Sequence, residues 1–524
     1  MYYQKYNSSL CRAFILLSLI LPCSYGNAAE KNDRPPNIVF LIADDLGYGD
    51  IGAFGQKKIK TPTLDKIAQD GMKLTRHYSG NPVCATSRCV LMTGKHPGHA
   101  QIRDNRETKP EGQYPLLPGT KTIARILNEN GYATGGFGKW GLGGPESDGR
   151  PVKQGFDRFF GYNCQARAHN FYPAYLWDND TKVELKNKLF PAHQKFPADA
   201  DPLAKSSYDR YKGEEYAPDL INEQAIKFIE QNKNRPFFFY YPTTVPHLAL
   251  QVPEDSLAEY QGRFEETPYD GSRAYLPNLT PRATYAAMVT RLDTAIGRIL
   301  RKIDELGLTE NTIVVFTSDN GPLYDKLGGT DTDFFESARE LRGRKGSVYE
   351  GGIRVPTLVK FPGRVPPASS TDRVTGFEDW MPTLLKLAGL ESKLPEGSDG
   401  IDFSSTLLAQ NQPARPFLYR EFPGYGGQQA VWSGKWKAVR QNLNRPAAGA
   451  ANKKAVAKKK AVHSPDQIIT ELYDLVADPT ESRNVAADHP EVVRSMEAIM
   501  QSQHVPSSIF PMRLLDGKLA NTSK

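Results

Sequence analysis

The sequence lacks an apolar stretch long enough for a permanent transmembrane helix, which requires about 20 residues. The apolar run near its N-terminus, residues 13–21, is much shorter, follows Lys5 and Arg12, and precedes several small residues. A positively charged start, an apolar middle and a small-residue end are typical of a secretory signal. We therefore expect residues 1–28 to be a signal peptide cleaved near Ala28, and the mature protein to be exported to the periplasm or the extracellular space.

The sequence also lacks a real excess of one charge. Its formal net charge is +7, but Lys5 and Arg12 belong to the expected signal, and residues 441–465 contain six basic residues and no acidic one. The rest of the chain is near neutral, which gives no reason to expect nucleic acid as a partner. The Lys/Ala-rich segment 446–462 has no apolar periodicity, and it predicts an exposed loop.

Cysteine is scarce, with five among 524 residues. Two of the five precede residue 29, so that Cys84, Cys89 and Cys164 remain in the mature chain. An odd number in an exported protein indicates that one thiol has a role other than a disulfide. A buried free cysteine explains the count equally well, and a Cys89–Cys164 pair stays open.

Apolar and β-branched runs alternate with segments of helical period along most of the chain. The runs at 37–43, 132–137, 236–241, 312–316 and 355–361 read as buried parallel strands, and the segments 62–70, 120–130, 217–231 and 281–306 read as helices. Thr61 is the expected N-cap of the first helix. The alternation predicts an α/β fold, with a doubly wound, mostly parallel sheet and helices on both faces.

The pattern changes after about residue 410, and a chain of 524 residues is long for one domain. Residues 416–422 and 430–440 each read as an antiparallel strand, and residues 488–501 read as a closing helix. We therefore expect a catalytic α/β domain at 29–410 and a smaller C-terminal α+β domain at 411–524.

Polar residues follow four of the predicted strands. Because the carboxyl ends of parallel strands meet at one edge of a sheet, these side chains are expected to lie together: Asp44 and Asp45, Lys139, His247, and Asp319 with Asn320. Carboxylate and amide oxygens are hard ligands, which favour Ca²⁺ or Mg²⁺ over zinc. Helix caps and turns are the alternative explanation for each pair taken alone.

The segment Cys84-Ala85-Thr86-Ser87-Arg88, followed by Leu91-Met92-Thr93-Gly94, resembles the signature of the sulfatase family. Further segments match in the same order over nearly the whole mature chain: Asp44-Asp45, Gly138-Lys139-Trp140, Pro246-His247, Asp319-Asn320-Gly321-Pro322, and Arg344-Lys345-Gly346 with Tyr349-Glu350-Gly351-Gly352. The resemblance is to formylglycine-dependent type I sulfatases of the alkaline-phosphatase superfamily, in an arylsulfatase-like bacterial branch. It implies hydrolysis of sulfate monoesters and the same division into two domains.

The resemblance also implies the cofactors. A formylglycine-generating enzyme would oxidise Cys84 to formylglycine (3-oxoalanine), whose hydrate is the nucleophile. Ca²⁺, with Mg²⁺ less favoured, would be held by Asp44, Asp45, the oxidised Cys84, Asp319 and Asn320. The implied catalytic residues are Cys84 itself, Arg88 beside the nucleophile, Lys139 and Lys345 on the sulfate oxygens, and His247, with Lys345, as the proton donor to the leaving alcohol.

Two positions depart from the family pattern. Thr86 stands where the signature usually has proline or alanine, which bears on conversion of Cys84. Gly141 stands where many relatives have a histidine that assists elimination of sulfate. Glycine cannot transfer a proton, so another histidine is expected to substitute, or solvent does so; the candidates are His96, His99 and His169.

The expected substrate is a sulfated carbohydrate or a small sulfate ester. His99, Arg103 and His169 lie in segments next to catalytic ones and are the candidate substrate contacts, and Tyr172, Tyr175 and Trp177 are aromatic rings on which a sugar could stack. Two alternatives stay open: a phosphate or phosphonate ester hydrolase of the same superfamily, and a catalytically weak homologue that binds sulfated glycans.

Overall fold

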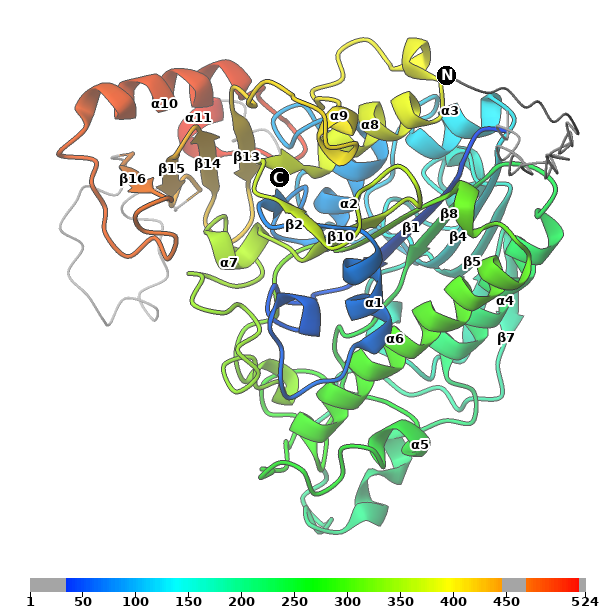
Figure 1. Ribbon diagram of the computed structural model, residues 1–524. Helices are drawn as coiled ribbons and strands as arrows, with labels where there is room; N and C mark the ends of the chain where they lie inside the picture. The colour runs from blue at the N-terminus through cyan, green and yellow to red at the C-terminus, as the bar shows by residue number, and fades with distance from the viewer. Residues whose placement is uncertain (1–33, 445–467, 518–524) are drawn as a thin grey trace, which may run out of the picture. The chain divides into compact units, whose positions relative to one another are not determined.

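The computed structural model describes residues 34–444 and 468–517, and from Pro35 onwards the chain forms one compact unit (Figure 1). The expected signal peptide, 1–28, and the Lys/Ala-rich segment, 446–462, lie outside the described residues. In the part of the chain that the structure describes, no helix is both long enough and apolar enough to cross a membrane.

A mixed sheet of ten strands forms the centre of the unit. Its order is β11 (Ser369–Thr371), β2 (Met72–Leu74), β10 (Thr357–Lys360), β9 (Thr312–Ser318), β1 (Asn37–Ala43), β8 (Phe237–Pro242), β4 (Ala133–Lys139), β5 (Arg158–Tyr162), β6 (Tyr175–Asp178) and β7 (Thr181–Glu184). The five strands from β9 to β5 run parallel, as expected for β9, β1, β8 and β4, whereas β5 was not predicted. A further small sheet pairs β3 (His77–Tyr78) with β12 (Thr375–Gly376).

The run at 355–361 was predicted to be a parallel strand, and this prediction is wrong. Strand β10 pairs antiparallel with both β9 and β2. A buried strand reads as a continuous apolar run whichever way it points, so the sequence signal carried no information on direction.

Side chains of β1 alternate between two cores, one on each face of the sheet. Val39 and Leu41 belong to one core, and Ile38 and Phe40 to the other. Helices cover both faces as predicted, and Figure 1 shows α4 and α6 side by side on one of them. The first core includes residues of α1 (Pro62–Asp70), α4 (Ala217–Gln231) and α6 (Pro281–Glu305), and the second includes residues of α2 (Cys84–Thr93), α3 (Ile123–Glu129) and α8 (Trp380–Leu387).

The prediction that Thr61 caps α1 is also wrong. The Thr61 side chain makes no capping bond to the helix; its hydroxyl instead accepts a hydrogen bond from Gly52 N at 2.8 Å. The carboxylate of Asp293, on α6, accepts from the backbone N–H groups of Thr63 and Leu64 at 3.0 and 2.8 Å. The free N–H groups at the start of α1 are therefore bonded by a residue 230 positions away, and no local sequence pattern reveals this cap.

A four-stranded antiparallel sheet lies in the C-terminal part of the chain, in the order β13 (Leu418–Phe422), β14 (Gln428–Ser433), β15 (Trp436–Gln441) and β16 (Thr470–Asp474). Helix α10 (Pro490–Gln503) packs on it (Figure 1). The run 430–440, expected as one strand, is two strands joined by a turn at Gly434, whose φ of +58° suits glycine. The remaining short helices are α5 (Glu254–Leu257), α7 (Glu350–Ile353), α9 (Ser404–Leu407) and α11 (Arg513–Asp516).

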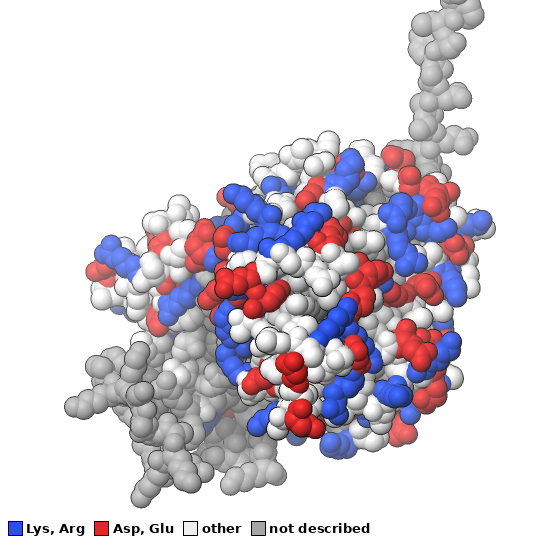
Figure 2. Space-filling view, turned by 90° about the horizontal axis from the view of Figure 1, so that it is seen from below, with Lys and Arg blue, Asp and Glu red and all other residues white. Residues whose placement is uncertain are grey.

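On the face drawn in Figure 2, lysine and arginine side chains are interspersed with aspartate and glutamate. This mixing agrees with the near-neutral charge expected for the mature chain outside its basic segment.

Candidate active site

Strands β1 and β9 bring the two acidic pairs together. Ala43 and Ser318, the last residues of the two strands, are register partners, so Asp44 and Asp319 follow side by side. Asp319 Oδ1 accepts a hydrogen bond from Asp45 N at 3.2 Å, and Asn320 Nδ2 donates to Asp45 Oδ1 at 2.7 Å. The parallel sheet therefore assembles the oxygen cluster from residues 275 positions apart.

Cys84 is the first residue of α2 and points into this cluster. Its thiol is buried and lies 3.4 Å from Asp44 Oδ1 and 3.5 Å from Lys345 Nζ. Burial, and then the carboxylates of Asp319 and Asp44, raise the pKa of the thiol far above its usual value. An unmodified Cys84 thus stays protonated and is a poor nucleophile.

Three buried cations surround the carboxylates. Arg88 follows Cys84 by one helical turn, and its Nη2 lies 2.8 Å from Asp319 Oδ2. Lys139, at the end of β4, lies 2.7 Å from Asp44 Oδ2, and Lys345 Nζ lies 2.8 Å from the Asp45 carboxylate.

His247 completes the cluster from the loop that follows β8. Its Nδ1 lies 2.7 Å from the carbonyl oxygen of Leu248, which makes Nδ1 the donor, and its Nε2 lies 3.3 Å from Asp45 Oδ2. Burial and the charge of Lys345 lower the pKa of His247 well below its usual value. The ring of His169 stacks on His247 with centroids 4.8 Å apart and planes 9° apart.

The oxygen cluster fits a hard divalent cation. One ligand atom each from Asp44, Asp45, Cys84 and Asp319 lie within 4.8 Å of one another. Beside them, Asn320 Oδ1 is buried and accepts no hydrogen bond among the described residues. Burial and the nearby Asp44 raise the pKa of Asp319 to about 6, because crowded buried carboxylates oppose one another's ionisation. A buried carbonyl oxygen without a donor, next to crowded carboxylates, is what a Ca²⁺ or Mg²⁺ ligand set requires.

Comparison with known proteins decides the family. A family model described as Sulfatase matches residues 36–390. The chain belongs to the sulfatase family. Arylsulfatase A of Homo sapiens is 33% identical over 514 residues, which cover 92% of this chain and 90% of the relative. An N-acetylgalactosamine-6-O-sulfatase of Bacteroides thetaiotaomicron is 29% identical, with 90% and 94% of the two chains covered.

Solved structures agree with this membership. The crystal structure of Ps i-CgsB in complex with k-i-k-neocarrahexaose is 25% identical, with a TM-score of 0.67 and 90% and 92% of the two chains covered. The predicted α/β architecture is thus confirmed, and the chain is an enzyme of the sulfuric ester hydrolase class.

Glycine at position 141 of this sulfatase has a steric explanation. Gly141 has a φ of +79°, and a Cβ built on it would lie 3.0 Å from Nε2 of Gln165. Gln165 thus fills the space into which a side chain at 141 would extend. The amide of Gln165 is 3.5 Å from Asn105 Oδ1, and Asn105 in turn accepts a hydrogen bond from Ala85 N, next to Cys84.

The three histidines considered as substitutes have different places in the sulfatase. His169 lies beside the cluster around Cys84, stacked on His247. His96 and His99 instead contact Asp399, with His99 Nδ1 2.9 Å from that carboxylate. Arg103, a candidate substrate contact together with His99, is buried in an ion pair with Glu421 at 2.8 Å.

Two residues at the cluster carried no signal in the sequence. His193 Nε2 lies 3.3 Å from His169 Nδ1, and Tyr275 N donates to His193 Nδ1 at 3.1 Å. Both lie in long connections between strands, and the fold, not a local motif, brings them beside His169. Cys84, Cys89 and Cys164 are all buried and free, so the possible Cys89–Cys164 pair is absent.

Proposed function

We propose that this sulfatase hydrolyses sulfate monoesters on carbohydrates, with Cys84 converted to formylglycine and Ca²⁺ bound beside it. The position of Cys84 among the oxygens of Asp44, Asp45 and Asp319 carries this proposal. Cys84 stands at the place where an oxidised side chain would meet the metal ligands, at the start of α2. Ca²⁺ suits the all-oxygen set better than the smaller Mg²⁺, which demands near-ideal octahedral geometry.

The two groups supply different chemistry. Hydrated formylglycine would supply one hydroxyl to attack sulfur and a second to release sulfate, and the cation would supply several kcal/mol of electrostatic stabilisation. The chain's own lysines contribute the contacts to the sulfate group. Lys139 and Lys345 are oriented by Asp44 and Asp45 toward the space beside Cys84, where they can hold sulfate oxygens.

The charge balance supports an anionic substrate. Asp44, Asp45 and Asp319 are matched by three cations, Arg88, Lys139 and Lys345, so the cluster alone is neutral. A divalent cation then leaves an excess of two positive charges. That excess suits a sulfate monoester and the negative charge that develops on the oxygens during transfer.

His247 is placed to protonate the leaving alcohol. Its Nδ1 bond to a backbone carbonyl fixes the ring, which leaves Nε2 to carry the transferable proton. The lowered pKa leaves the ring neutral in the free protein, so His247 must gain a proton at Nε2, beside the anionic substrate, before it can donate one to the leaving alcohol. A positioned acid of this kind contributes about 10²- to 10⁴-fold to the rate.

The nature of the relatives supports a sugar substrate. One is named for N-acetylgalactosamine 6-O-sulfate, and another was solved with a neocarrahexaose. We further propose export to the periplasm or the extracellular space and maturation by a formylglycine-generating enzyme, on the basis of residues 1–28 and the Cys84 signature.

The decisive experiment combines mass analysis and turnover, on protein from its native host. The peptide containing Cys84 is expected to be lighter than its cysteine form by about 18 Da, since a carbonyl oxygen replaces H and SH. The same protein should hydrolyse an aryl sulfate, lose this activity to a calcium chelator, and recover it with added Ca²⁺. Cys84→Ala is the matched inactive control.

Each alternative predicts a different result. An aryl phosphate turned over much faster than the sulfate would favour the phosphate or phosphonate hydrolase. An unshifted Cys84 peptide together with glycan binding would favour the non-catalytic homologue. A Cys84→Ala protein with full sulfatase activity would exclude the formylglycine mechanism.

A further inference from the structure

A cavity of about 550 Å³ lies beside the catalytic loops and has no part in the chemistry described above. Glu111, Arg167, Tyr175, Trp177 and Lys182 are among the residues that line it. Its volume is within the range of about 300–1,000 Å³ that is usual for small-ligand sites.

Three short stretches of chain connect the catalytic cluster to this cavity. Gly144 on its wall is five positions after Lys139, which is at most about 18 Å of extended chain. Asn105, which accepts the Ala85 N–H beside Cys84, leads to Thr108 on the same wall. The two sites are therefore near enough for one oligosaccharide to reach both.

The third stretch is the short helical turn Arg167–His169. His169 at its end stacks on the catalytic His247, while Arg167 at its start lines the cavity. Two residues of one turn thus face the two sites.

A β-hairpin gives the cavity an aromatic wall. Tyr175 and Trp177 alternate with the buried Leu176 along β6, so both rings lie on one face of the strand. The Glu111 carboxylate accepts hydrogen bonds from the Tyr175 hydroxyl and, at 3.0 Å, from Trp177 Nε1. Glu111 thus holds both rings in place, and its oxygens are used in doing so.

Two cations flank the Tyr175 ring. Lys182 Nζ lies 4.2 Å from the ring centroid, and Arg167 Cζ lies 5.7 Å from it. Among the described residues, neither Lys182 nor Arg167 forms an ion pair with a carboxylate. Their charges are therefore available to an anionic ligand.

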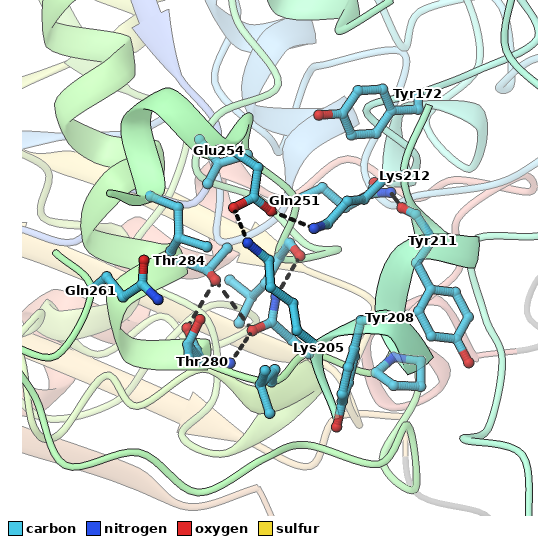
Figure 3. Close-up of a pocket in the computed structure, with 16 residues that line it drawn as sticks. Tyr172, Lys205, Tyr208, Tyr211, Lys212, Gln251, Glu254, Gln261, Thr280 and Thr284 are labelled. Atoms are coloured by element: carbon cyan, nitrogen blue, oxygen red, sulfur yellow. Dashed lines mark hydrogen bonds and ion pairs between the residues drawn. The ribbon is translucent and has the colours of Figure 1, made fainter. Parts of the chain in front are cut away.

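The pocket in Figure 3 shows the contrasting case. Its two lysines, Lys205 and Lys212, both point at Glu254 and bond to it, Lys205 at 2.8 Å (Figure 3). Its volume is about 80 Å³, too small for a sugar ring with its substituents. Asp209 also lies 3.6 Å from Lys212, so two carboxylates balance the two lysines. Lysines that line a pocket do not make an anion site when carboxylates already neutralise them.

We infer that the cavity between Arg167 and Lys182 is a second subsite, which binds an anionic sugar residue of the chain whose sulfate is removed at Cys84. Arg167 and Lys182 hold a sulfate or carboxylate group of that residue, and the Trp177 ring contacts the apolar side of the sugar. The inference rests on the proposed function for the identity of the substrate. It makes the preferred substrate an oligosaccharide with more than one charged residue.

Binding to the non-hydrolysing Cys84→Ala protein tests this, because it does not depend on turnover. The probes are a chondroitin 6-sulfate tetrasaccharide with N-acetylgalactosamine 6-sulfate, and a κ-carrageenan tetrasaccharide with galactose 4-sulfate. We expect at least one tetrasaccharide to bind more tightly than its monosaccharide by calorimetry. Arg167→Gln and Lys182→Gln should each weaken binding of that tetrasaccharide about tenfold, because each removes one charge-assisted contact. Binding of the monosaccharide should weaken less than twofold.

Lys205→Gln, in the pocket of Figure 3, is the matched control and should change neither affinity. A hyaluronan tetrasaccharide, which has carboxylates and no sulfate, identifies the anion that the subsite binds. If it binds and the same two variants weaken its binding, a carboxylate is enough to occupy the subsite. The inference is overturned if no tetrasaccharide binds more tightly than its monosaccharide. It is equally overturned if the two variants weaken binding of a tetrasaccharide and of its monosaccharide by the same factor. If the unaltered protein has no sulfatase activity while the tetrasaccharide still binds more tightly than its monosaccharide, the proposed function alone is contradicted.

Discussion

Two buried charge clusters of this sulfatase have equal numbers of acids and bases, yet their bonding is very different. One, named the catalytic cluster after its proposed role, consists of Asp44, Asp45, Asp319, Arg88, Lys139 and Lys345. The Glu378 cluster, which joins the β13 strand to the start of α8, consists of Glu378, Asp379, Arg415 and Arg420.

In the Glu378 cluster the acceptors are used internally. Arg420 donates through Nη1 and Nη2 to the two oxygens of Glu378, both at 2.9 Å. Asp379 accepts from Arg415 and from the backbone N–H groups of Gly376 and Ile401. Although burial opposes it, Arg420 and Arg415 lower the pKa of Glu378 to about 2. This cluster has a structural role.

In the catalytic cluster the bonding is incomplete. Asn320 Oδ1 beside it accepts no hydrogen bond among the described residues, and the pKa of Asp319 is raised to about 6. The difference teaches that balanced charge does not identify a functional site. What distinguishes this cluster is an open acceptor next to crowded carboxylates, because folding alone does not compensate their desolvation.

The largest expected effect is on turnover. Asp319→Asn should lower kcat on an aryl sulfate by at least about 10³-fold, since it weakens a cation worth several kcal/mol to the transition state. Steady-state kinetics with saturating Ca²⁺ measure this. Activity within tenfold of the unaltered enzyme would mean that Asp319 is no essential ligand, and the contrast between the clusters would then fail.

The next effect is on stability. Arg420→Met should lower the free energy of unfolding by about 3–5 kcal/mol, because it leaves Glu378 buried with Arg415 as its remaining cationic partner. Urea unfolding measures the loss, and kcat per folded molecule should stay within about threefold. A change below about 1 kcal/mol would show that Arg415 alone satisfies Glu378.

Much of the catalytic cluster could be predicted, because it depends on strand ends. Parallel strands in register must place the residues after Ala43 and after Ser318 together, so Asp44 and Asp319 could be paired from sequence. Cys84, Lys139 and Lys345 followed from family motifs, and the structure brings all three to the same place.

The parts that escaped prediction depend on long-range packing. Asp293 caps α1 from α6, and His193 and Tyr275 reach His169 from long connections. Arg103 looked available for substrate because Glu421, its partner, is 318 residues away. In each case the deciding partner is distant in sequence, where propensity and periodicity carry no information.

The smallest effect concerns pH and separates the two clusters by sign. Glu378 has a folded-state pKa of about 2, below the unfolded value of about 4.5, so its contribution to stability is present above the unfolded value and is lost as pH falls toward 2. In metal-free protein Asp319, with its pKa raised to about 6, has the opposite dependence: stability is lost as pH rises through 6.

Unfolding of metal-free protein as a function of pH tests both signs. Between pH 4.5 and 2, Glu378 should contribute a loss of about 3 kcal/mol, from 1.36 kcal/mol per unit of pKa, and Glu378→Gln should remove this slope. Between pH 4 and 6, Asp319→Asn should remove a slope of the other sign. Equal slopes in a variant and the unaltered protein would show that the group in question does not titrate differently on folding. Because bound Ca²⁺ keeps Asp319 ionised, added Ca²⁺ should abolish the second slope and leave the first unchanged.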